Sequence, residues 1–256
     1  IIGFLSWLPA RNMKGEIRIR DGFIITVLFW LVLSTFGALP FALSQETNLS
    51  FIDALFESIS GLTTTGATVF TNLEDLPKSI LYYRQQLQWL GGIGIVVIAV
   101  SILPMIGVGG MQIYKAETPG PIKDTKLTPR IAETANALFK IYVFLTVVCA
   151  IAYWVAGMSW FDALSHSFST ISIGGFSTYN ESLGHFDNNA VLTIASIFMV
   201  VSGLNFALHY TAWHARSIKS YISDPEARLF VLVILFGILV TTCLLYTSDA
   251  ADEPVC

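Results

Sequence analysis

Five long apolar runs dominate the sequence, and polar residues cluster between them. Each run is close to the roughly 20 residues that a helix needs to cross a bilayer, so each predicts a membrane span. The runs cover residues 22–43, 80–106, 138–158, 190–213 and 229–245. Residues 1–9 are also apolar but too short to cross, and we interpret them as the end of a preceding helix. Because the chain opens without an initiator Met, we expect it to be part of a longer protein.

One stretch of sequence occurs twice between these runs. Residues 51–68 (FIDALFESISGLTTTGAT) pair without a gap with residues 160–177 (WFDALSHSFSTISIGGFS). Each copy begins with enough residues for a short helix and then continues in hydroxyl and glycine residues, where a spanning helix would stay apolar. The pattern predicts a re-entrant pore helix followed by an irregular loop, at matching points of a repeat.

The irregular loops are candidates for an ion filter. Backbone that is not helical is tolerated at membrane depth only where it is buried in protein or lines a watery cavity. Rings of backbone carbonyls can replace the hydration shell of a cation, and glycine adopts the backbone angles that turn a carbonyl inward. The gapless match selects Gly66 and Gly175 rather than Gly174 as the equivalent glycines. A threonine-rich turn in an external loop is the alternative for the first copy, but it leaves the repeat unexplained.

Asp53 and Asp162 fall in the first turn of the two predicted pore helices. A carboxylate there can bond free backbone amides and complements the positive end of the helix dipole. The negative end of the helix would then point toward the pore centre. We interpret both residues as helix caps, because this position does not bring either carboxylate to the filter.

The distribution of Lys and Arg predicts the orientation. Basic residues concentrate in segments 11–20, 115–130 and 216–228, which the positive-inside rule assigns to the cytoplasm. The segments between them hold Lys78 and Arg84 as their cations, so both loops should face outside. The acidic residues on that side are Glu46, Asp53, Glu57, Glu74, Asp75, Asp162, Glu181 and Asp187. They either form a vestibule that concentrates cations or are merely tolerated, since the rule counts only Lys and Arg.

Composition agrees with an integral membrane protein. The chain has 256 residues, 54% hydrophobic and 12% charged, against about 25% charged in average soluble domains. Cys149, Cys243 and Cys256 have no metal-binding spacing and suggest no disulfide framework. The net charge of −4 argues against a nucleic-acid partner. We expect an all-α integral membrane protein, potassium-channel-like and truncated, built from helix–pore loop–helix units with re-entrant pore helices, without a cofactor.

The order of span, pore loop and span occurs twice, so the axis relating the two units should run along the membrane normal. The expected segments are the end of a preceding helix at 1–10, a first unit at 11–110, a cytoplasmic linker at 111–136, a second unit at 137–215, and a linker with the start of a third unit at 216–242. Prolines 119, 121 and 129 should keep the linker extended. Residues 243–256 (CLLYTSDAADEPVC) resemble a translated sequencing adapter and are predicted to be non-native.

Other features of the spans have simpler interpretations. Gly91, Gly92 and Gly94 in the second span should allow close packing between helices. Arg84 could pair with Glu74 or Asp75, or act as a surface anchor. Pro40 is expected to end the first span, Pro104 to bend or end the second, and the glycines of 107–110 to form a hinge.

Three stretches carry a resemblance to a known family. They are residues 63–70 (TTTGATVF), 88–95 (QWLGGIGI) and 173–178 (IGGFST). In combination the chain resembles the TrkH/KtrB family of bacterial potassium-uptake proteins, more closely its TrkH branch, over almost all of its length to about residue 242. The family arranges four such units around one pore, with one filter glycine from each.

The resemblance implies a site and partners. Gly66 and Gly175 would be the filter glycines of the first two units, and the backbone carbonyls of Thr64, Thr65, Ile173 and Gly174 would bind potassium. The protein would lie in the inner membrane among lipid as a homodimer, with a TrkA-like nucleotide-binding regulatory subunit on its cytoplasmic face. Because two loops cannot encircle an ion, we expect the 256-residue chain alone not to conduct.

Two alternatives stay open on the sequence. A sodium- or proton-coupled cation symporter of the same fold is one, since potassium preference depends on filter geometry. The other is an intramembrane hydrolase using Ser167 or Ser172 with His166. A dyad would sit in one loop only, and unit one has Glu57 where unit two has His166, so the repeat favours the pore.

Overall fold

The computed structural model describes residues 19–106 and 127–252, and every regular element in these ranges is helical. The elements are α2 (Ile19–Leu43), α3 (Phe51–Leu62), η1 (Leu73–Asp75), α4 (Lys78–Ile106), α6 (Leu127–Val155), α7 (Trp160–Ile171), η3 (Ser182–Phe186), α8 (Asn189–Gly203), α9 (Phe206–Ala215), α10 (Lys219–Ser223) and α11 (Pro225–Asp252). The predicted preceding helix at 1–10 and the hinge at 107–110 lie outside the described residues.

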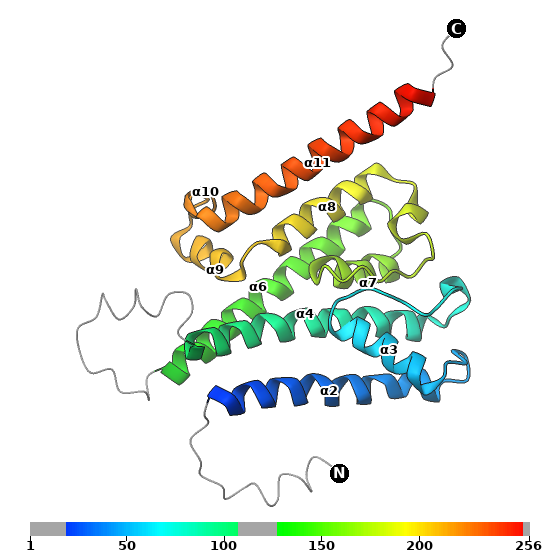
Figure 1. The fold of residues 1–256 in the computed structure, drawn as a ribbon, viewed down its shortest axis with the longest axis horizontal. Coiled ribbons are helices and arrows are strands. Elements are labelled where there is room, and N and C mark those ends of the chain that lie inside the picture. The colour runs from blue at the N-terminus through cyan, green and yellow to red at the C-terminus, as the bar shows by residue number, and fades with distance from the viewer. Residues whose placement is uncertain (1–18, 107–126, 253–256) are drawn as a thin grey trace, which may run out of the picture.

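The long helices are stacked side by side, with the two short helices between them (Figure 1). Helix α3 packs against α2 and α4, and α7 packs against α4, α6 and α8. The loops that follow α3 and α7 lie at the same end of the molecule (Figure 1). The structure thus has two units of the same plan, α2–α3–α4 and α6–α7–α8. Helix α4 of the first unit packs against α6 and α7 of the second.

The two short helices start in the same way. Ser50 precedes α3, accepts a hydrogen bond from the Asp53 amide (3.2 Å) and donates to the Asp53 carboxylate (2.7 Å). Ser159 and Asp162 repeat this arrangement at α7, at 3.1 and 2.6 Å. Each helix has 12 residues, about 18 Å at 1.5 Å per residue, too short to cross a bilayer. The predicted first-turn position of both aspartates is confirmed, but their interpretation as the caps is wrong, because Ser50 and Ser159 accept the free amides and the aspartates hold these serines.

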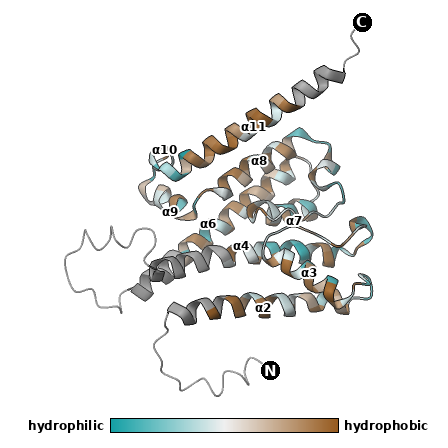
Figure 2. Ribbon diagram, viewed as in Figure 1, coloured by the Kyte–Doolittle hydropathy of each residue, from teal (hydrophilic) through white to brown (hydrophobic). Residues whose placement is uncertain are grey.

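Two helices are long and apolar enough to span a membrane among the described residues, by length and composition. They are Ala135–Val155 in α6 and Pro225–Leu244 in α11, and Val27–Leu43 in α2 is a shorter apolar segment. Apolar residues run along the sides of the long helices, whereas hydrophilic residues collect toward their ends (Figure 2). The pattern agrees with the predicted membrane protein.

The predicted span at 190–213 is wrong as one straight helix. Helix α8 ends at Gly203 and α9 begins at Phe206, with a 90° bend between the two, so that only as a bent pair do they form a third candidate span. Asn205 explains the break, because its side chain accepts from the Ala207 amide (3.0 Å) and caps a new helix. A polar cap inside an apolar run does not show in average hydropathy.

Other boundaries also differ from the expectations. Helix α6 begins at Leu127, ahead of the boundary predicted at 137, so the linker is not extended through Pro129. This proline lies in the first turn, where its missing N–H removes no helical hydrogen bond. Pro40 lies inside α2, and α4 runs past Pro104 to Ile106. Residues 243–252 continue α11 as a helix, and their predicted non-native origin stays a prediction.

Each unit has its own apolar core. One contains Ala38, Phe41, Ala54, Leu62, Ile80 and Leu87, and the other contains Tyr142, Cys149, Tyr153, Met158, Ala163, Ile171, Val191 and Ala195. Helix α4 contributes to both, since Leu87 lies in the first core and Trp89 packs on the second. The Trp89 ring also stacks on Phe168 of α7, with 5.2 Å between centroids.

Glycines of α4 allow this close packing. A Cβ on Gly91 would collide with the Leu62 carbonyl oxygen, and one on Gly92 would lie 2.5 Å from the Tyr142 hydroxyl. The predicted packing role is confirmed for Gly91 and Gly92, whereas a Cβ on Gly94 would make only ordinary contacts with Trp30. Helix α4 therefore approaches the ends of both short helices more closely than a side chain would permit.

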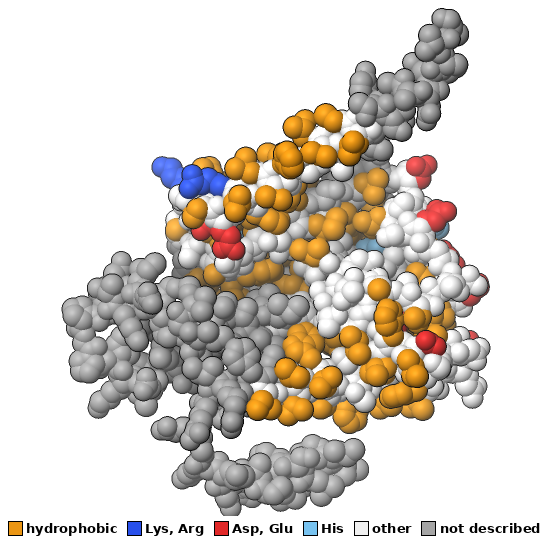
Figure 3. Space-filling view, viewed as in Figure 1, with side chains coloured by type: hydrophobic (Ala, Val, Ile, Leu, Met, Phe, Trp, Pro, Cys, Tyr) orange, Lys and Arg blue, Asp and Glu red, His pale blue; other side chains and the backbone are white. Residues whose placement is uncertain are grey.

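The visible Lys and Arg side chains lie at one end of the molecule. Figure 3 shows them near α10, with one acidic patch beside them, whereas the other visible Asp and Glu side chains lie along the end that carries the loops after α3 and α7. The visible cations thus lie away from the loops, as the distribution of Lys and Arg predicted.

Candidate pore loops and the residues that hold them

The segments that follow the two short helices, loop one (63–70) and loop two (172–179), have the same backbone geometry. Thr64 and Ile173 have φ of +55° and +54°, and Gly66 and Gly175 have φ of +78° and +81°. The amides also match: Thr64 N donates to Gly61 O and Ile173 N to Thr170 O, at 3.0 and 3.2 Å. Thr65 N bonds Ser60 O and Gly174 N bonds Ser169 O, at 2.9 and 2.8 Å.

Each loop has two residues with positive φ, separated by one residue, and the first of them carries a conformational cost. The left-handed region is rarely adopted by β-branched residues such as Thr64 and Ile173, and a residue held there costs about 1–3 kcal/mol. Gly66 and Gly175 take the second such position without a Cβ penalty. The geometry recurs in both loops, which marks it as a constructed feature rather than an accident of one turn.

The structure brings several predicted site residues together. A Cβ on Gly66 of loop one would collide with the carbonyl oxygen of Gly174 in loop two, so these two residues are in close contact. The Gly174 oxygen also accepts a hydrogen bond from Gln88 Nε2 (2.6 Å). Among the described residues, no hydrogen bond is donated to the carbonyls of Thr64, Thr65 or Ile173. Their assignment as potassium ligands stays a prediction.

A buried ion pair lies behind the loops. Arg84 of α4 and Glu57 of α3 are both 0% exposed, and Nε donates to the carboxylate at 2.7 Å. The Arg84 Nη1 donates to the Ser177 carbonyl and Nη2 to the Thr68 hydroxyl, at 3.0 Å each. Its guanidinium also lies over the Phe176 ring, 4.3 Å from the centroid. One cation therefore contacts both loops.

Glu57 also accepts hydrogen bonds from loop one. Its carboxylate accepts from the Thr68 hydroxyl and from the Val69 amide, at 3.0 Å. The expectation that Arg84 pairs with Glu74 or Asp75, or is a surface anchor, is wrong. The desolvated guanidinium needs a partner at the same depth, and Glu57 provides one.

Sequence reasoning missed Glu57, Arg84 and Gln88 as site residues. The usable signal was the polar group Arg84, Gln85, Gln86 and Gln88 at the start of a span. Ionisable residues within membrane segments face the protein interior and pair there. The partner could not be read from the sequence, because Glu57 is 27 positions away.

The proposed hydrolase dyad does not form. Ser167 Oγ donates to the Leu164 carbonyl (2.7 Å) and Ser172 Oγ to the Ser169 carbonyl (3.2 Å). His166 bonds the Asp162 carbonyl oxygen through Nδ1 (2.9 Å) and Ser177 Oγ through Nε2 (3.0 Å). Because His166 and Ser177 are buried and no carboxylate orients the ring, this pair fastens α7 to loop two.

Asp162 has more partners than its counterpart Asp53. Besides Ser159, it accepts from the hydroxyls of Thr178 (3.0 Å) and Tyr179 (3.3 Å), and it is buried. Asp53 bonds only Ser50 among the described residues. Asp162 therefore links the start of α7 to the end of loop two.

The outer segments of the two units are joined beyond the loops. Asn180 donates its backbone amide to Glu74 (3.0 Å), its side-chain amide bonds the other carboxylate oxygen, and it accepts from the Leu73 amide (3.2 Å). The hydrogen bond from the Asn180 backbone lowers the pKa of the Glu74 carboxyl below its usual value. Glu74 is exposed, so water screens this interaction.

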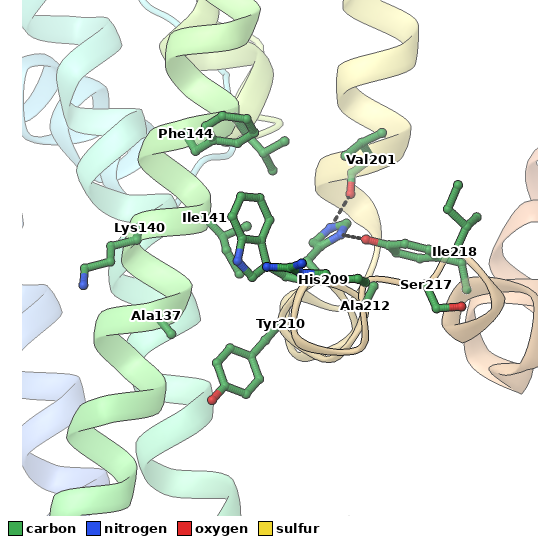
Figure 4. Close-up of a pocket in the computed structure, with 14 residues that line it drawn as sticks. Ala137, Lys140, Ile141, Phe144, Val201, His209, Tyr210, Ala212, Ser217 and Ile218 are labelled. Atoms are coloured by element: carbon green, nitrogen blue, oxygen red, sulfur yellow. Dashed lines mark hydrogen bonds between the residues drawn. The ribbon is translucent and has the colours of Figure 1, made fainter.

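A separate cavity of about 920 Å³ lies among α6, α8, α9 and α10 and involves neither loop. Figure 4 shows His209 at its wall, bonded to the Val201 carbonyl (2.9 Å) and to the Tyr221 hydroxyl (2.8 Å). The remaining wall is largely apolar, including Phe144 and Trp213. Within the described residues, no group of three or more His, Cys, Asp or Glu could hold a metal ion.

Repeated helix–loop–helix units with matched irregular loops define a class of membrane protein, the cation transporters built from pore-loop repeats. Comparison with known proteins makes this specific: residues 1–249 match the family model of the TrkH cation transport proteins, and the chain belongs to that family. The family is a transporter family rather than an enzyme family, in agreement with the unformed dyad.

Similar proteins cover almost all of this chain. The Trk system potassium uptake protein TrkH of Halomonas elongata is 58% identical over 248 residues, which is 96% of this chain and 52% of that protein. TrkH of Escherichia coli is 56% identical over 245 residues, 96% of this chain and 51% of the relative. The chain therefore spans about half the length of these relatives.

The fold also matches a solved structure. The crystal structure of the potassium transporter TrkH from Vibrio parahaemolyticus is similar with a TM-score of 0.86 at 48% sequence identity. The match covers 99% of this chain and 51% of that one. The predicted all-helical membrane fold, present as a partial chain, is confirmed.

Proposed function

We propose that this chain supplies two of the pore loops of a transporter that takes up potassium across the bacterial inner membrane. The observation that carries the proposal is the repeated geometry of loops one and two, with positive φ at Gly66 and Gly175. The names of its relatives support potassium as the ion. In this proposal the carbonyls of Thr64, Thr65, Ile173 and Gly174 contribute to the filter, and no covalent chemistry occurs.

The orientation is part of the proposal. The loops face outside and the basic segments face the cytoplasm, because Lys and Arg are retained on the inner side. Acidic side chains near the loops would raise the local cation concentration at the outer mouth. Reaction of cysteines introduced at Glu181 and at Lys219 with a membrane-impermeant reagent tests this, and labelling of whole cells at Lys219 but not Glu181 would reverse the orientation.

Assembly follows the family resemblance. We propose a homodimer that binds a TrkA-like nucleotide-binding subunit through the basic segments at 11–20, 115–130 and 216–228. The cations of these segments would attract an acidic surface, although the topology rule also accounts for them. Co-purification of a TrkA-type protein with the full-length transporter tests the partner, and its absence at low salt would contradict the proposal.

The function is tested with the complete gene that encodes this chain, in a bacterium unable to take up potassium. Wild type should restore growth at low potassium, and Gly66→Asp should not, because it adds a side chain where a Cβ already collides with Gly174. Gly184→Asp adds the same charge where nothing lies within 4 Å and should behave as wild type. Equal rescue by all three would overturn the filter assignment.

Ion flux separates the remaining alternatives. Liposomes with the full-length protein should show potassium uptake, while the 256-residue chain alone should show none, because two loops leave a filter open. Uptake that requires a sodium or proton gradient would favour the symporter instead.

A further inference from the structure

The contact between the two loops is centred on the carbonyl of Gly174. It touches Gly66 of loop one on one side and accepts the Gln88 amide at 2.6 Å on another. A backbone carbonyl has two lone pairs, so one can accept from Gln88 while the other stays available. The orientation of this oxygen is therefore set by α4 as well as by its own loop.

Gln88 holds loop two at both sides of Gly175. Its Nε2 donates to the Gly174 oxygen, and its Oε1 accepts from the Phe176 amide at 3.1 Å. The side chain is 0% exposed, so both bonds form without competition from water. The amide offers a donor and an acceptor from two atoms on one carbon, which matches the carbonyl and the amide that loop two presents.

The match between Gln88 and loop two is also steric. A Cβ on Gly174 would collide with the amide carbon of Gln88, so the loop backbone lies directly on this side chain. Loop one has Thr65 at the equivalent position, and no amide side chain bonds its carbonyl among the described residues. The pair of hydrogen bonds from Gln88 is therefore found in loop two and not in loop one.

We propose that Gln88 is a positioning residue that sets the ion selectivity of the filter by fixing the Gly174 carbonyl. The inference rests on the proposed potassium pore and names the residue that holds one of its ligands. Selectivity depends on the spacing and field strength of coordinating carbonyls. Removing the donor frees this oxygen to move, and it also removes the polarisation that the bond imposes.

The test compares two glutamines of the same helix. Gln88→Met removes both hydrogen bonds while keeping the size of the side chain. Gln85→Met makes the same change three positions earlier, where the side chain is also 0% exposed but neither amide atom has a hydrogen-bond partner among the described residues. The readout is the ratio of rubidium to sodium uptake by the full-length transporter in liposomes, which does not depend on the number of active copies.

Gln88→Met should lower the ratio by about three- to tenfold, the effect expected for one or two hydrogen bonds. Gln88→Glu should lower it further when the carboxyl is ionised, because a carboxylate oxygen would then face the Gly174 oxygen, and raising the pH should strengthen the effect. Gln85→Met should keep the wild-type ratio. A general packing defect would reduce uptake of both ions in parallel and leave the ratio unchanged.

The outcomes separate this inference from the proposed function. If wild type transports rubidium selectively and Gln88→Met keeps the same ratio, the role of Gln88 is wrong while the pore assignment stands. If wild type transports neither ion, the proposed function itself fails. If Gln88→Met and Gln88→Glu are both absent from the membrane while Gln85→Met is retained, Gln88 is a folding residue and the inference is overturned.

Discussion

At the scale of single residues, the buried pair of Glu57 and Arg84 carries a large desolvation cost. Both side chains are removed from water, and desolvation of each charge is repaid only by good geometry and additional hydrogen bonds. Arg84 has them in Ser177 and Thr68, and Glu57 has them in Thr68 and Val69. The pair is therefore stable as a unit and depends on both partners.

Removing one partner should be more harmful than removing both charges. Arg84→Met leaves the Glu57 carboxylate buried and unpaired, and we expect a loss of about 3–5 kcal/mol in the free energy of unfolding. In the double variant Glu57→Gln/Arg84→Met the uncompensated charge is gone. Its free energy of unfolding should therefore be higher than that of Arg84→Met by about 1–2 kcal/mol or more. Denaturant unfolding of the full-length protein in detergent measures the difference.

A surface cation of the same helix provides the control for this comparison. Lys78→Met removes an exposed charge from α4 and should change stability by no more than about 1 kcal/mol, the worth of its contact with the Phe161 ring 5.3 Å away. A double variant that is no more stable than Arg84→Met would show that packing, rather than unpaired charge, dominates at this position.

At the scale of elements, α4 organises both loops from one side. Arg84 and Gln88 are four residues apart and so lie on one face of the helix, from which they reach loop one and loop two. Gly91, one turn further, lets the end of α3 approach. The helix that the sequence identified as a plain membrane span is thus also the support of the candidate filter.

Packing at Gly91 should be sensitive to a single methyl group. In Gly91→Ala the new Cβ would overlap the Leu62 carbonyl oxygen, a backbone atom that cannot rotate aside. We expect a destabilisation of about 1–3 kcal/mol. Gly237→Ala, on a face of α11 where nothing lies within 4 Å, should be neutral or stabilising by up to about 1 kcal/mol. Equal melting temperatures for the two variants in detergent would refute close packing at Gly91.

The repeat made the two short helices predictable from the sequence, because each copy contains a cap, a helix-length segment and a glycine loop. Composition and hydropathy predicted the membrane class, because both are summed over long apolar runs. The bend at Asn205 was not predictable by averaging over a window, since one capping amide changes the backbone without changing mean hydropathy. The contacts of Arg84 and Gln88 depend on how α4 packs between two units, which local patterns do not encode.

At the scale of the whole molecule, the two units are joined near the loops as well as where α4 packs against α6 and α7. Loop one and loop two touch at Gly66 and Gly174, Arg84 reaches across behind them to the Ser177 carbonyl, and Glu74 bonds Asn180 at the outer surface. Arg84, Ser177 and Gly174 are buried and Gly66 is half-buried, whereas Glu74 and Asn180 of the outer contact are exposed. Only the outer contact should therefore respond directly to the pH of the medium.

The contact between Glu74 and Asn180 should weaken in acid. Hydrogen bonding to the folded chain lowers the pKa of Glu74, so its stabilising contribution is present above the unfolded value, about 4.3, and is lost as pH falls through the lower folded value. The difference in melting temperature between wild type and Glu74→Gln should be largest at neutral pH and shrink toward zero as the pH falls below the lowered folded pKa. Asp75→Asn removes a neighbouring exposed carboxylate and is the matched control for the loss of a charge at this surface. A difference for Glu74→Gln that grew on acidification would contradict the assigned direction, because it would require the folded structure to favour the protonated carboxyl.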